Sequence, residues 1–398
     1  MGVSRKPTVL SVFTGAGGLD LGLELAGFQT VACIEVDETA RATIRANRPP
    51  WPFLDPADVT QVVDVLSPQA IGMSRGELDV LAGGPPCQPF SKAAQWSVRG
   101  ATGLRDPRAR CVEAFIRLLD VFLPRVMLIE NVPGFAKGRN NAVPLIEQAL
   151  ARINKQFGVQ YSLESRVLNA SDYGVPQRRE RAILIATRDR CSFQWPEPTH
   201  AITPVRAWDA LANVHERGYP PLTGRWSALL PSIPEGQNYI WHTPHGGGLP
   251  LFGYRTRYWS FLLKLAKNQP AWTIAAQPGP ATGPFHWDNR PLTMREMLRL
   301  QSFPASWKVA GDRRAQILQV GNATPPLLSE VIGRAIGQGI FGLRYDGSPR
   351  LYISRKSTIP PPARLQRVPV PYRRLQGNHL AHPGAGRGPR PVSRPEAA

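Results

Sequence analysis

Short apolar runs alternate with amphipathic segments of helical length along the first half of the chain. The apolar runs have the length and composition of buried strands and cover residues 8–13, 30–35, 78–82, 126–130 and 181–187. Apolar residues that recur every three or four positions predict helices at residues 19–26, 38–48, 108–122 and 145–156. This alternation predicts βαβ units and an α/β fold with a mostly parallel, doubly wound sheet. Ligands of such sheets bind beyond the carboxyl ends of the strands.

The pattern changes near Cys191. The next hundred or so residues are rich in Pro, Gly, Trp, Tyr and His and show little helical periodicity, which predicts a smaller, irregular domain. Helical periodicity returns at residues 290–301 and 326–338, which we expect to complete the first domain. After residue 342 the chain has ten prolines and little apolar periodicity, which predicts a disordered tail. The expected divisions are residues 1–192, 193–288, 289–342 and 343–398.

The chain is strongly basic, with a net charge of +19. Residues 343–398 contain 11 Arg or Lys residues and two acidic ones, a net +9, which leaves +10 on the rest of the chain. A basic body favours a polyanionic partner, such as a nucleic acid, held by phosphate contacts. A solvated basic surface would produce the same charge.

The four cysteines, at positions 33, 87, 111 and 191, are far apart, and none has a histidine at ligand spacing. This spacing predicts neither a metal site nor a disulfide framework, and it suits a reducing compartment. No apolar run is long enough to span a membrane, and the first residues do not form a secretion signal. We therefore expect a cytoplasmic monomer without a membrane segment.

A glycine-rich turn, residues 13–18, follows the first predicted strand and begins a helix. Such a turn lets the backbone approach a ligand closely at a helix N-terminus. A dinucleotide-binding enzyme is one alternative, but its third glycine would fall on Asp20, whose carboxylate would repel a pyrophosphate. The turn therefore favours an adenosyl cofactor without phosphates. Glu35, at the end of the second strand, is placed to accept hydrogen bonds from ribose hydroxyls.

Three further segments place reactive side chains at strand ends. Cys87 lies in a Gly/Pro loop directly after a buried strand, where a catalytic cysteine is more plausible than a core cysteine. Glu130 follows four apolar strand residues and is a candidate proton or hydrogen-bond donor. Before the strand at 181–187, alternation puts Arg179 and Arg181 on one face and Arg178 on the other, although an exposed basic run would look alike.

Together these segments resemble the bacterial DNA cytosine-5 methyltransferase family. The matching pieces, in the order that the family has them, are Phe13 to Gly18, Glu35, Asp58 to Thr60, Gly83 to Ser91, Asp106 to Arg108, Glu130 to Val132, Gln177 to Arg181, Arg290 to Glu296 with Phe303 and Pro304, and Gln319 to Asn322. The resemblance implies a Rossmann-like methyltransferase domain that acts on double-stranded DNA and uses S-adenosyl-L-methionine, with a smaller target-recognition domain at residues 193–288.

The resemblance also implies roles for individual residues. Cys87 would be the nucleophile, Glu130 would engage the cytosine ring nitrogen, and Arg179 and Arg181 would hold a flipped nucleotide. The implied cofactor-binding residues are Phe13, Gly15, Gly17, Gly18, Glu35, Asp58, Pro86 and Asn322. Two positions depart from the family: Val36 replaces a common aromatic residue, and Cys111 replaces a common leucine.

The expected reaction follows from the chemistry of cytosine. Carbon 5 is a weak nucleophile, so a thiolate must add at carbon 6 before the methyl group can be accepted. Because that atom is inaccessible within a duplex, the base must be flipped out. Arginines and aromatic residues between residues 206 and 264 could contact DNA, although most of the aromatic residues are expected to form a small core.

Three alternatives stay open at this point. One is a catalytically silent DNA-binding homologue, against which the presence of both Cys87 and Glu130 argues. An RNA cytosine-5 methyltransferase of the same fold would share every catalytic residue. A nicotinamide-dependent oxidoreductase would fit only the first 40 or so residues and would explain neither the Cys87 loop nor the charge. A compact catalytic body suits a restriction-modification system with a partner endonuclease, but the sequence does not reveal the DNA word.

Overall fold

The computed structural model describes residues 5–86, 110–138, 141–189, 191, 193–216, 218–254 and 258–377. Its first domain is built on a sheet of β1 (Thr8–Val12), β2 (Gln29–Ile34), β3 (Val80–Gly83), β4 (Val126–Asn131), β5 (Ser162–Asn169) and β6 (Glu180–Thr187). The strand order is β2-β1-β3-β4-β6-β5. β1 to β4 are parallel, whereas β6 is antiparallel to both β4 and β5. The predicted α/β fold with a mostly parallel sheet is confirmed.

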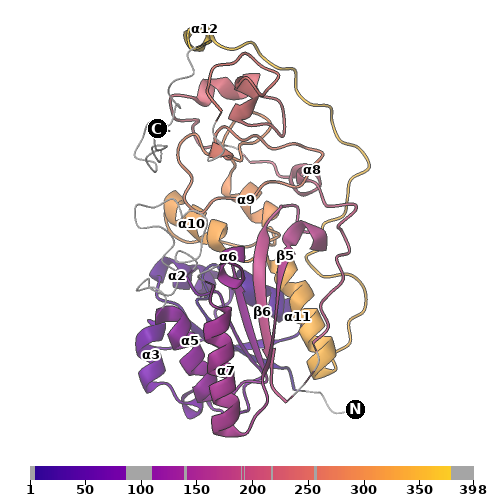
Figure 1. Cartoon of the computed structure of the whole chain (residues 1–398). Coiled ribbons are helices and arrows are strands. Elements are labelled where there is room, and N and C mark those ends of the chain that lie inside the picture. The colour runs from indigo at the N-terminus through magenta and orange to yellow at the C-terminus, as the bar shows by residue number, and fades with distance from the viewer. Residues whose placement is uncertain are drawn as a thin grey trace, which may run out of the picture.

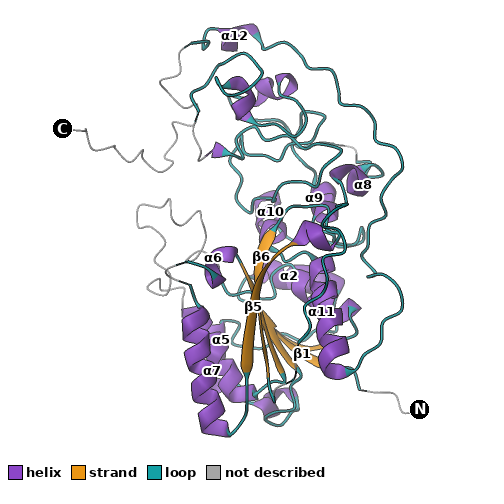
Figure 2. Ribbon diagram, turned by 45° about the vertical axis from the view of Figure 1, so that its right-hand side comes forward, coloured by secondary structure: helices purple, strands orange, loops and turns teal. Residues whose placement is uncertain are grey.

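Helices cover both faces of this sheet (Figures 1 and 2). One face packs on α1 (Gly18–Leu25) and α11 (Pro326–Phe341). The other packs on α3 (Val59–Val65), α5 (Arg110–Phe122) and α7 (Val143–Phe157). Strand residues alternate between the two cores, as the two-residue period of a strand requires: Val9 and Val80 belong to the first core, and Leu10 and Leu81 to the second.

Four further helices in the part of the chain that the structure describes complete this domain. They are α2 (Glu38–Asn47), α6 (Pro133–Ala136), α9 (Met294–Leu300) and α10 (Arg313–Asn322). α9 is shorter than the helix expected at 290–301, because Thr293 caps it: the hydroxyl accepts from the Glu296 amide, and the Glu296 carboxylate accepts from the Thr293 amide.

The sequence pattern did not predict β5 or α10. β5 is an edge strand whose residues are mostly exposed, so it lacks the continuous apolar run of a buried strand. α10 begins at an Asp312 cap, but only Gln319, Val320 and Gly321 are buried, near its end. Periodicity detects neither kind of element, because both depend on neighbouring elements for their burial.

The second domain consists mainly of loops with short helical turns. It contains α8 (Ala207–Leu211) and 3-10 turns at Ser227–Ser232 and Tyr239–His242. A separate apolar core, which includes Trp226, Tyr239, Phe252 and Phe261, holds it together. Many of the aromatic residues between 206 and 264 therefore form a core, as expected.

Residues 343–377 do not form the disordered tail that the sequence pattern predicts. They run from the end of α11 along the outside of the molecule to the second domain, where they form α12 (Val370–Arg373) (Figure 1). Ile353 is buried, and main-chain atoms along the path are hydrogen bonded to both domains. The many prolines allow an extended path fixed by isolated contacts, which apolar periodicity does not detect. Residues 378–398 lie outside the described residues.

Among the described residues, no helix is long and apolar enough to cross a membrane.

Candidate active site

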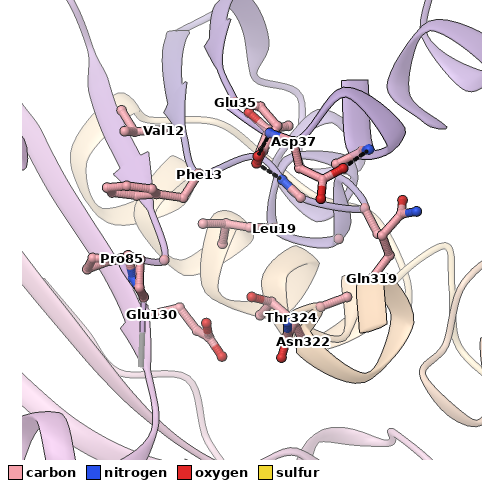
Figure 3. Close-up of a pocket in the computed structure, with 18 of the residues that line it drawn as sticks. Val12, Phe13, Leu19, Glu35, Asp37, Pro85, Glu130, Gln319, Asn322 and Thr324 are labelled. Atoms are coloured by element: carbon pink, nitrogen blue, oxygen red, sulfur yellow. Dashed lines mark hydrogen bonds between the residues drawn. The ribbon is translucent and has the colours of Figure 1, made fainter. Parts of the chain in front are cut away.

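A cavity of about 300 Å³ lies at the carboxyl ends of the parallel strands. Its lining comes from the glycine-rich turn after β1, the end of β2, residues 84–86 after β3, residues 130–132 at the end of β4, and residues 318–324 of α10 and the following turn. Figure 3 shows Glu35 and Asp37 at one end and Glu130 with Asn322 and Thr324 at the other, with Phe13 and Leu19 between them. The cavity therefore lies where a doubly wound sheet binds its ligands.

Glu35 fixes the glycine-rich turn against the end of β2. Its carboxylate accepts a hydrogen bond from the Gly15 amide at 2.7 Å and from the Asp37 amide at 2.8 Å. Burial raises the pKa of Glu35. Phe13 lines the cavity beside this turn, whereas Gly17 lies outside the lining and caps α1 in a left-handed conformation, with φ of 76°.

Asp20 is a buried carboxylate on the wall of the cavity. The residue is 1% exposed, and its Oδ1 has no hydrogen-bond partner among the described residues. Burial raises the pKa of Asp20 to about 6. A buried acid without full compensation costs folding free energy, so this carboxylate calls for a cationic or hydrogen-bond-donating ligand.

Glu130 forms the opposite end of the cavity together with Arg181. The Arg181 Nε lies 2.8 Å from the Glu130 Oε1, and both side chains are largely buried. Beside them, the Asn131 side chain donates a hydrogen bond to the Pro85 carbonyl at 2.8 Å. This bond holds the segment that leads to Pro86, the last described residue before position 87. Cys87 itself lies outside the described residues.

Arg179 lies beneath the turn that carries Asn322. It is 1% exposed, and its Nη2 donates to the carbonyls of Gly321 at 2.8 Å and Ala323 at 3.0 Å. Asn322 lies between these two residues and lines the cavity. Arg179 therefore contacts the backbone on either side of a cavity residue and is not itself part of the cavity lining.

The cavity brings together most of the residues that the resemblance implies. Those that line it are Phe13, Gly15, Gly18, Glu35, Pro86, Glu130, Arg181 and Asn322. Gly17, Asp58 and Arg179 do not line it. Asp58 instead caps α3, where its carboxylate accepts from the Thr60 amide at 2.8 Å.

Sequence reasoning did not assign six polar residues of the lining: Thr14, Asp20, Asp37, Asn131, Gln319 and Thr324. Asp37 could have been found, because an aspartate that precedes a helical pattern is a typical N-cap, and it accepts from the amides of Thr39 and Ala40. Gln319 carries no comparable local signal. Its Oε1 accepts from the Thr43 hydroxyl of α2 at 2.6 Å, a contact between residues far apart in the chain.

A second cavity of about 470 Å³ shares Val132 and Arg181 with the first and lies between the two domains. Arg178 and Trp272 line it, with the guanidinium 4.9 Å from the indole ring. A cation and an aromatic face at the entrance to an acidic cavity can bind a phosphate and a base, respectively.

Comparison with known proteins places this site in a family. The family model described as C-5 cytosine-specific DNA methylase matches residues 8–338. The Type II methyltransferase M.SacI of Streptomyces achromogenes is 32% identical over 372 residues, which cover 84% of this chain and 93% of the relative. The Type II methyltransferase M.PspPI of a Psychrobacter species is 32% identical over 355 residues, which cover 84% of this chain and 79% of the relative.

Two solved structures share the fold. The Entamoeba histolytica methyltransferase EhMeth has a TM-score of 0.57 at 17% identity, covering 86% of this chain and 100% of that one. The S. pombe Dnmt2 methyltransferase has a TM-score of 0.53 at 17% identity, and the match covers 85% of this chain and 100% of that one. The family match rules out the nicotinamide-dependent oxidoreductase. The chain belongs to the C-5 cytosine-specific DNA methylase family and is a DNA cytosine-5 methyltransferase.

Proposed function

We propose that this enzyme methylates one cytosine within a short DNA recognition sequence, called the word below, as the modification enzyme of a Type II restriction-modification system. The proposal includes Cys87 as nucleophile, Glu130 and Arg181 as residues that bind the flipped cytosine, and S-adenosyl-L-methionine as methyl donor. The observation that carries it is the pairing of Glu130 with Arg181 at one end of a cavity whose other end is closed by Glu35.

The chemical roles follow from the needs of the reaction. The Cys87 thiolate adds to carbon 6 of the cytosine, and this new bond moves electron density to carbon 5. Glu130 bonds to ring nitrogen 3 and the amino group and so stabilises the electron-rich ring, while Arg181 orients the Glu130 carboxylate. After carbon 5 is methylated, its proton passes to water, the sulfur–carbon 6 bond breaks, and Cys87 is free again.

The lining of the cavity fits S-adenosyl-L-methionine. When bound, this cofactor supplies a methyl group on a positively charged sulfur atom. Asp20 lies on the wall of the same cavity, and its buried Oδ1 has no hydrogen-bond partner among the described residues, which suits a cationic ligand and disfavours a pyrophosphate. Glu35 would accept hydrogen bonds from ribose hydroxyls, and Phe13, Pro86 and Asn322 would pack around the adenosyl group.

The second domain is proposed to read the DNA sequence. The net charge of +19 favours binding to phosphates, and the cavity lined by Arg178 and Trp272 lies between the domains, beside Arg181. Type II methyltransferases among the relatives suggest a partner endonuclease that cuts the same word.

Bisulfite sequencing of DNA from cells that express the chain tests the activity and reveals the word. With that word known, duplex DNA that carries 5-fluorocytosine at the target should form a denaturation-resistant adduct, because fluorine cannot leave as a proton does. The Cys87→Ser variant should form no adduct and no methylcytosine, yet bind cofactor within a few-fold of wild type.

Cys191→Ser is the matched control, because Cys191 packs beside the α11 core, away from the cavity, and should tolerate the change. Substantial methylation by Cys87→Ser, or an adduct that disappears equally in both variants, would overturn the assignment of Cys87.

A further inference from the structure

The segment 343–377, called the strap below, is attached first to the catalytic domain. The buried Glu330 carboxylate of α11 accepts hydrogen bonds from the amides of Arg350 at 2.7 Å and Leu351 at 3.2 Å. The Tyr345 hydroxyl donates to the Ala26 carbonyl at the end of α1 at 2.7 Å. A buried carboxylate that binds main-chain amides fixes the path of the strap independently of its side chains.

The second attachment is to α8, which belongs to the second domain in sequence but packs against α9 in one apolar core and is thereby fixed to the catalytic domain. The buried Asp209 accepts from the Lys356 amide at 2.8 Å, and Arg206, which pairs with Asp209, donates to the Lys356 carbonyl at 2.5 Å. Two residues further on, the Thr358 carbonyl accepts from the Trp208 indole at 3.0 Å. The strap is therefore bonded to both members of an ion pair, and to a neighbouring indole, on one short helix.

The third attachment is to the core of the second domain. The Gln366 amide donates to the Pro231 carbonyl at 3.0 Å, and the Tyr372 hydroxyl donates to the Arg225 carbonyl at 2.5 Å. The Tyr372 ring packs against Trp226, with ring centroids 5.8 Å apart. This end of the strap thus contributes apolar surface to the core of the domain that it reaches.

Between the second and third attachments the strap lies exposed on the outside of the molecule. At the start of this crossing the Pro361 carbonyl accepts a hydrogen bond from the Lys267 Nζ at 3.4 Å, so the unattached part begins at Pro362. Residues 360–367 are all exposed. Three consecutive prolines, Pro360 to Pro362, begin this crossing, and proline runs act as semi-rigid spacers. A stiff, exposed spacer between two well-bonded ends maintains a separation and buries little surface of its own. Figure 1 shows the crossing on the side of the molecule away from α2 and α10.

We propose that the strap is an interdomain tie that positions the second domain over the active site and so contributes to the choice of DNA sequence. The inference rests on the proposed reading role of that domain. A fixed separation would hold the sequence-reading surface in register with the flipped cytosine, and the strap would act by positioning, without contact to the reacting atoms.

The test is to lengthen the tie without removing either end. A short, flexible Gly-Ser segment inserted between Ala363 and Arg364 keeps every attachment but removes the fixed separation. The same segment inserted after Gly377, beyond the last attachment, is the matched control. Bisulfite-based methylation kinetics would be measured on the cognate word and on words with one base changed.

For the Ala363 insertion we expect kcat/KM on the cognate word to fall about tenfold or more, because small misplacement of reacting groups is costly. Preference for the cognate word should fall too, while cofactor affinity and Tm stay near wild type. Amide exchange in the second domain should stay slow within its core, because the tie sets placement and not folding.

Tyr372→Ala, which removes the side-chain part of the third attachment and leaves the Gln366–Pro231 bond, should reproduce part of the loss of preference, and Tyr372→Phe, which keeps the ring, should reproduce less of it. Kinetics unchanged by the Ala363 insertion would overturn the proposal. An insertion variant with a lower Tm or a weaker cofactor affinity than wild type would also overturn it, because the strap would then be needed for the stability of the fold and not for the position of the second domain. A wild-type chain that methylates no DNA would refute the proposed function instead.

Discussion

At the residue scale, Asp20 is a buried acid of the site whose Oδ1 has no hydrogen-bond partner among the described residues. Its carboxylate is buried at the cavity wall with one oxygen unpaired, and burial raises its pKa to about 6. The ordinary pKa of an aspartate in an unfolded chain is near 4, so the folded protein binds more protons than the unfolded one between these values. Stability therefore falls as the pH rises from about 4 to about 6, by about 3 kcal/mol in total, and stays lower above that.

Asp20→Asn should make the cofactor-free protein more stable at pH 8 and weaken the binding of S-adenosyl-L-methionine. The amide has no charge to bury, so the stability cost disappears at high pH, and the advantage of the variant should vanish near pH 4 to 5. The loss of a negative charge beside a cationic ligand should raise the Kd about tenfold. Denaturant unfolding across pH and titration calorimetry measure the two effects.

A control at a neighbouring acid separates charge from packing. Asp37 also lines the cavity, but it is exposed and caps α2, and the hydrogen bond from the Thr39 hydroxyl lowers its pKa. Asp37 therefore stays ionised in the folded protein above about pH 4, so Asp37→Asn should leave the fall in stability between about pH 4 and 6 as it is in wild type. An Asp20→Asn protein that is less stable than wild type at pH 8 would show that the carboxylate is better compensated than its geometry indicates.

Part of the site could be predicted from the sequence, because some of its residues directly follow predicted strands. Glu35 and Glu130 each follow an apolar run, and the topology of a parallel sheet brings such positions to one edge. The position of Arg179 was not predictable, because strand alternation gives the face of a side chain and not its partner. Its bonds to Gly321 and Ala323 depend on a turn far along the chain.

At the element scale, the packing of α1 against α11 holds the glycine-rich turn and the Asn322 turn close together. A Cβ added at Gly22 would lie 2.3 Å from the Ser329 Cβ and 2.5 Å from the Glu330 nitrogen and the Pro326 oxygen. Real Cβ atoms do not approach so closely, so the two helices can pack at this distance only with glycine at position 22. The helix that α1 touches also carries Glu330, which binds the strap.

Gly22→Ala should therefore destabilise the protein by about 1–3 kcal/mol, the usual range for overpacking, despite the higher helix propensity of alanine. Separation of α1 from α11 should also weaken cofactor binding. Gly279→Ala is the control, because its Cβ would meet only the flexible Thr282 hydroxyl, at 3.3 Å. Urea unfolding gives the free energies, and equal stability of both variants would show that the helices can shift without cost.

Periodicity predicted most of the buried elements, but it missed the short helix α3, although Val59, Val62 and Val63 are buried, and it missed elements whose burial depends on partners. The strands β1 to β4 and β6, and the helices α1, α2, α5, α7 and α11, all follow strong apolar patterns. Their boundaries differ from the expected ones by a few residues. The edge strand β5 buries one residue and the helix α10 buries three, and neither shows such a pattern.

At the scale of the whole molecule, composition predicted the basic character but not the path of the last residues. A high proline and arginine content with few apolar residues is typical of disorder. The strap is ordered instead by main-chain bonds to Glu330, Asp209 and Pro231, and no side-chain pattern reports such bonds. A disordered tail could be cut off after Arg344 without effect, whereas in this structure such a cut would remove every one of these attachments.

The corrected position for a harmless cut is after Gly377. Residues 378–398 contain three arginines and one glutamate, and every attachment of the strap precedes them. Their removal should leave the methylated word, kcat and Tm unchanged. It should weaken binding to unrelated DNA and lower the slope of log K against log salt by about one for each phosphate that an arginine no longer neutralises. The reason is that arginine–phosphate pairs release counterions without reading bases.

Binding of the full and shortened chains to an unrelated duplex across a salt series measures the change in slope. Methylation kinetics on the cognate word measure kcat, bisulfite sequencing identifies the methylated word, and thermal unfolding gives Tm. A chain in which the three arginines are replaced by glutamine, at full length, is the control for charge alone and should show the same slope as the shortened chain. A different methylated word after the cut, or a fall in Tm, would mean that residues beyond the strap also take part in reading DNA or in holding the domains together.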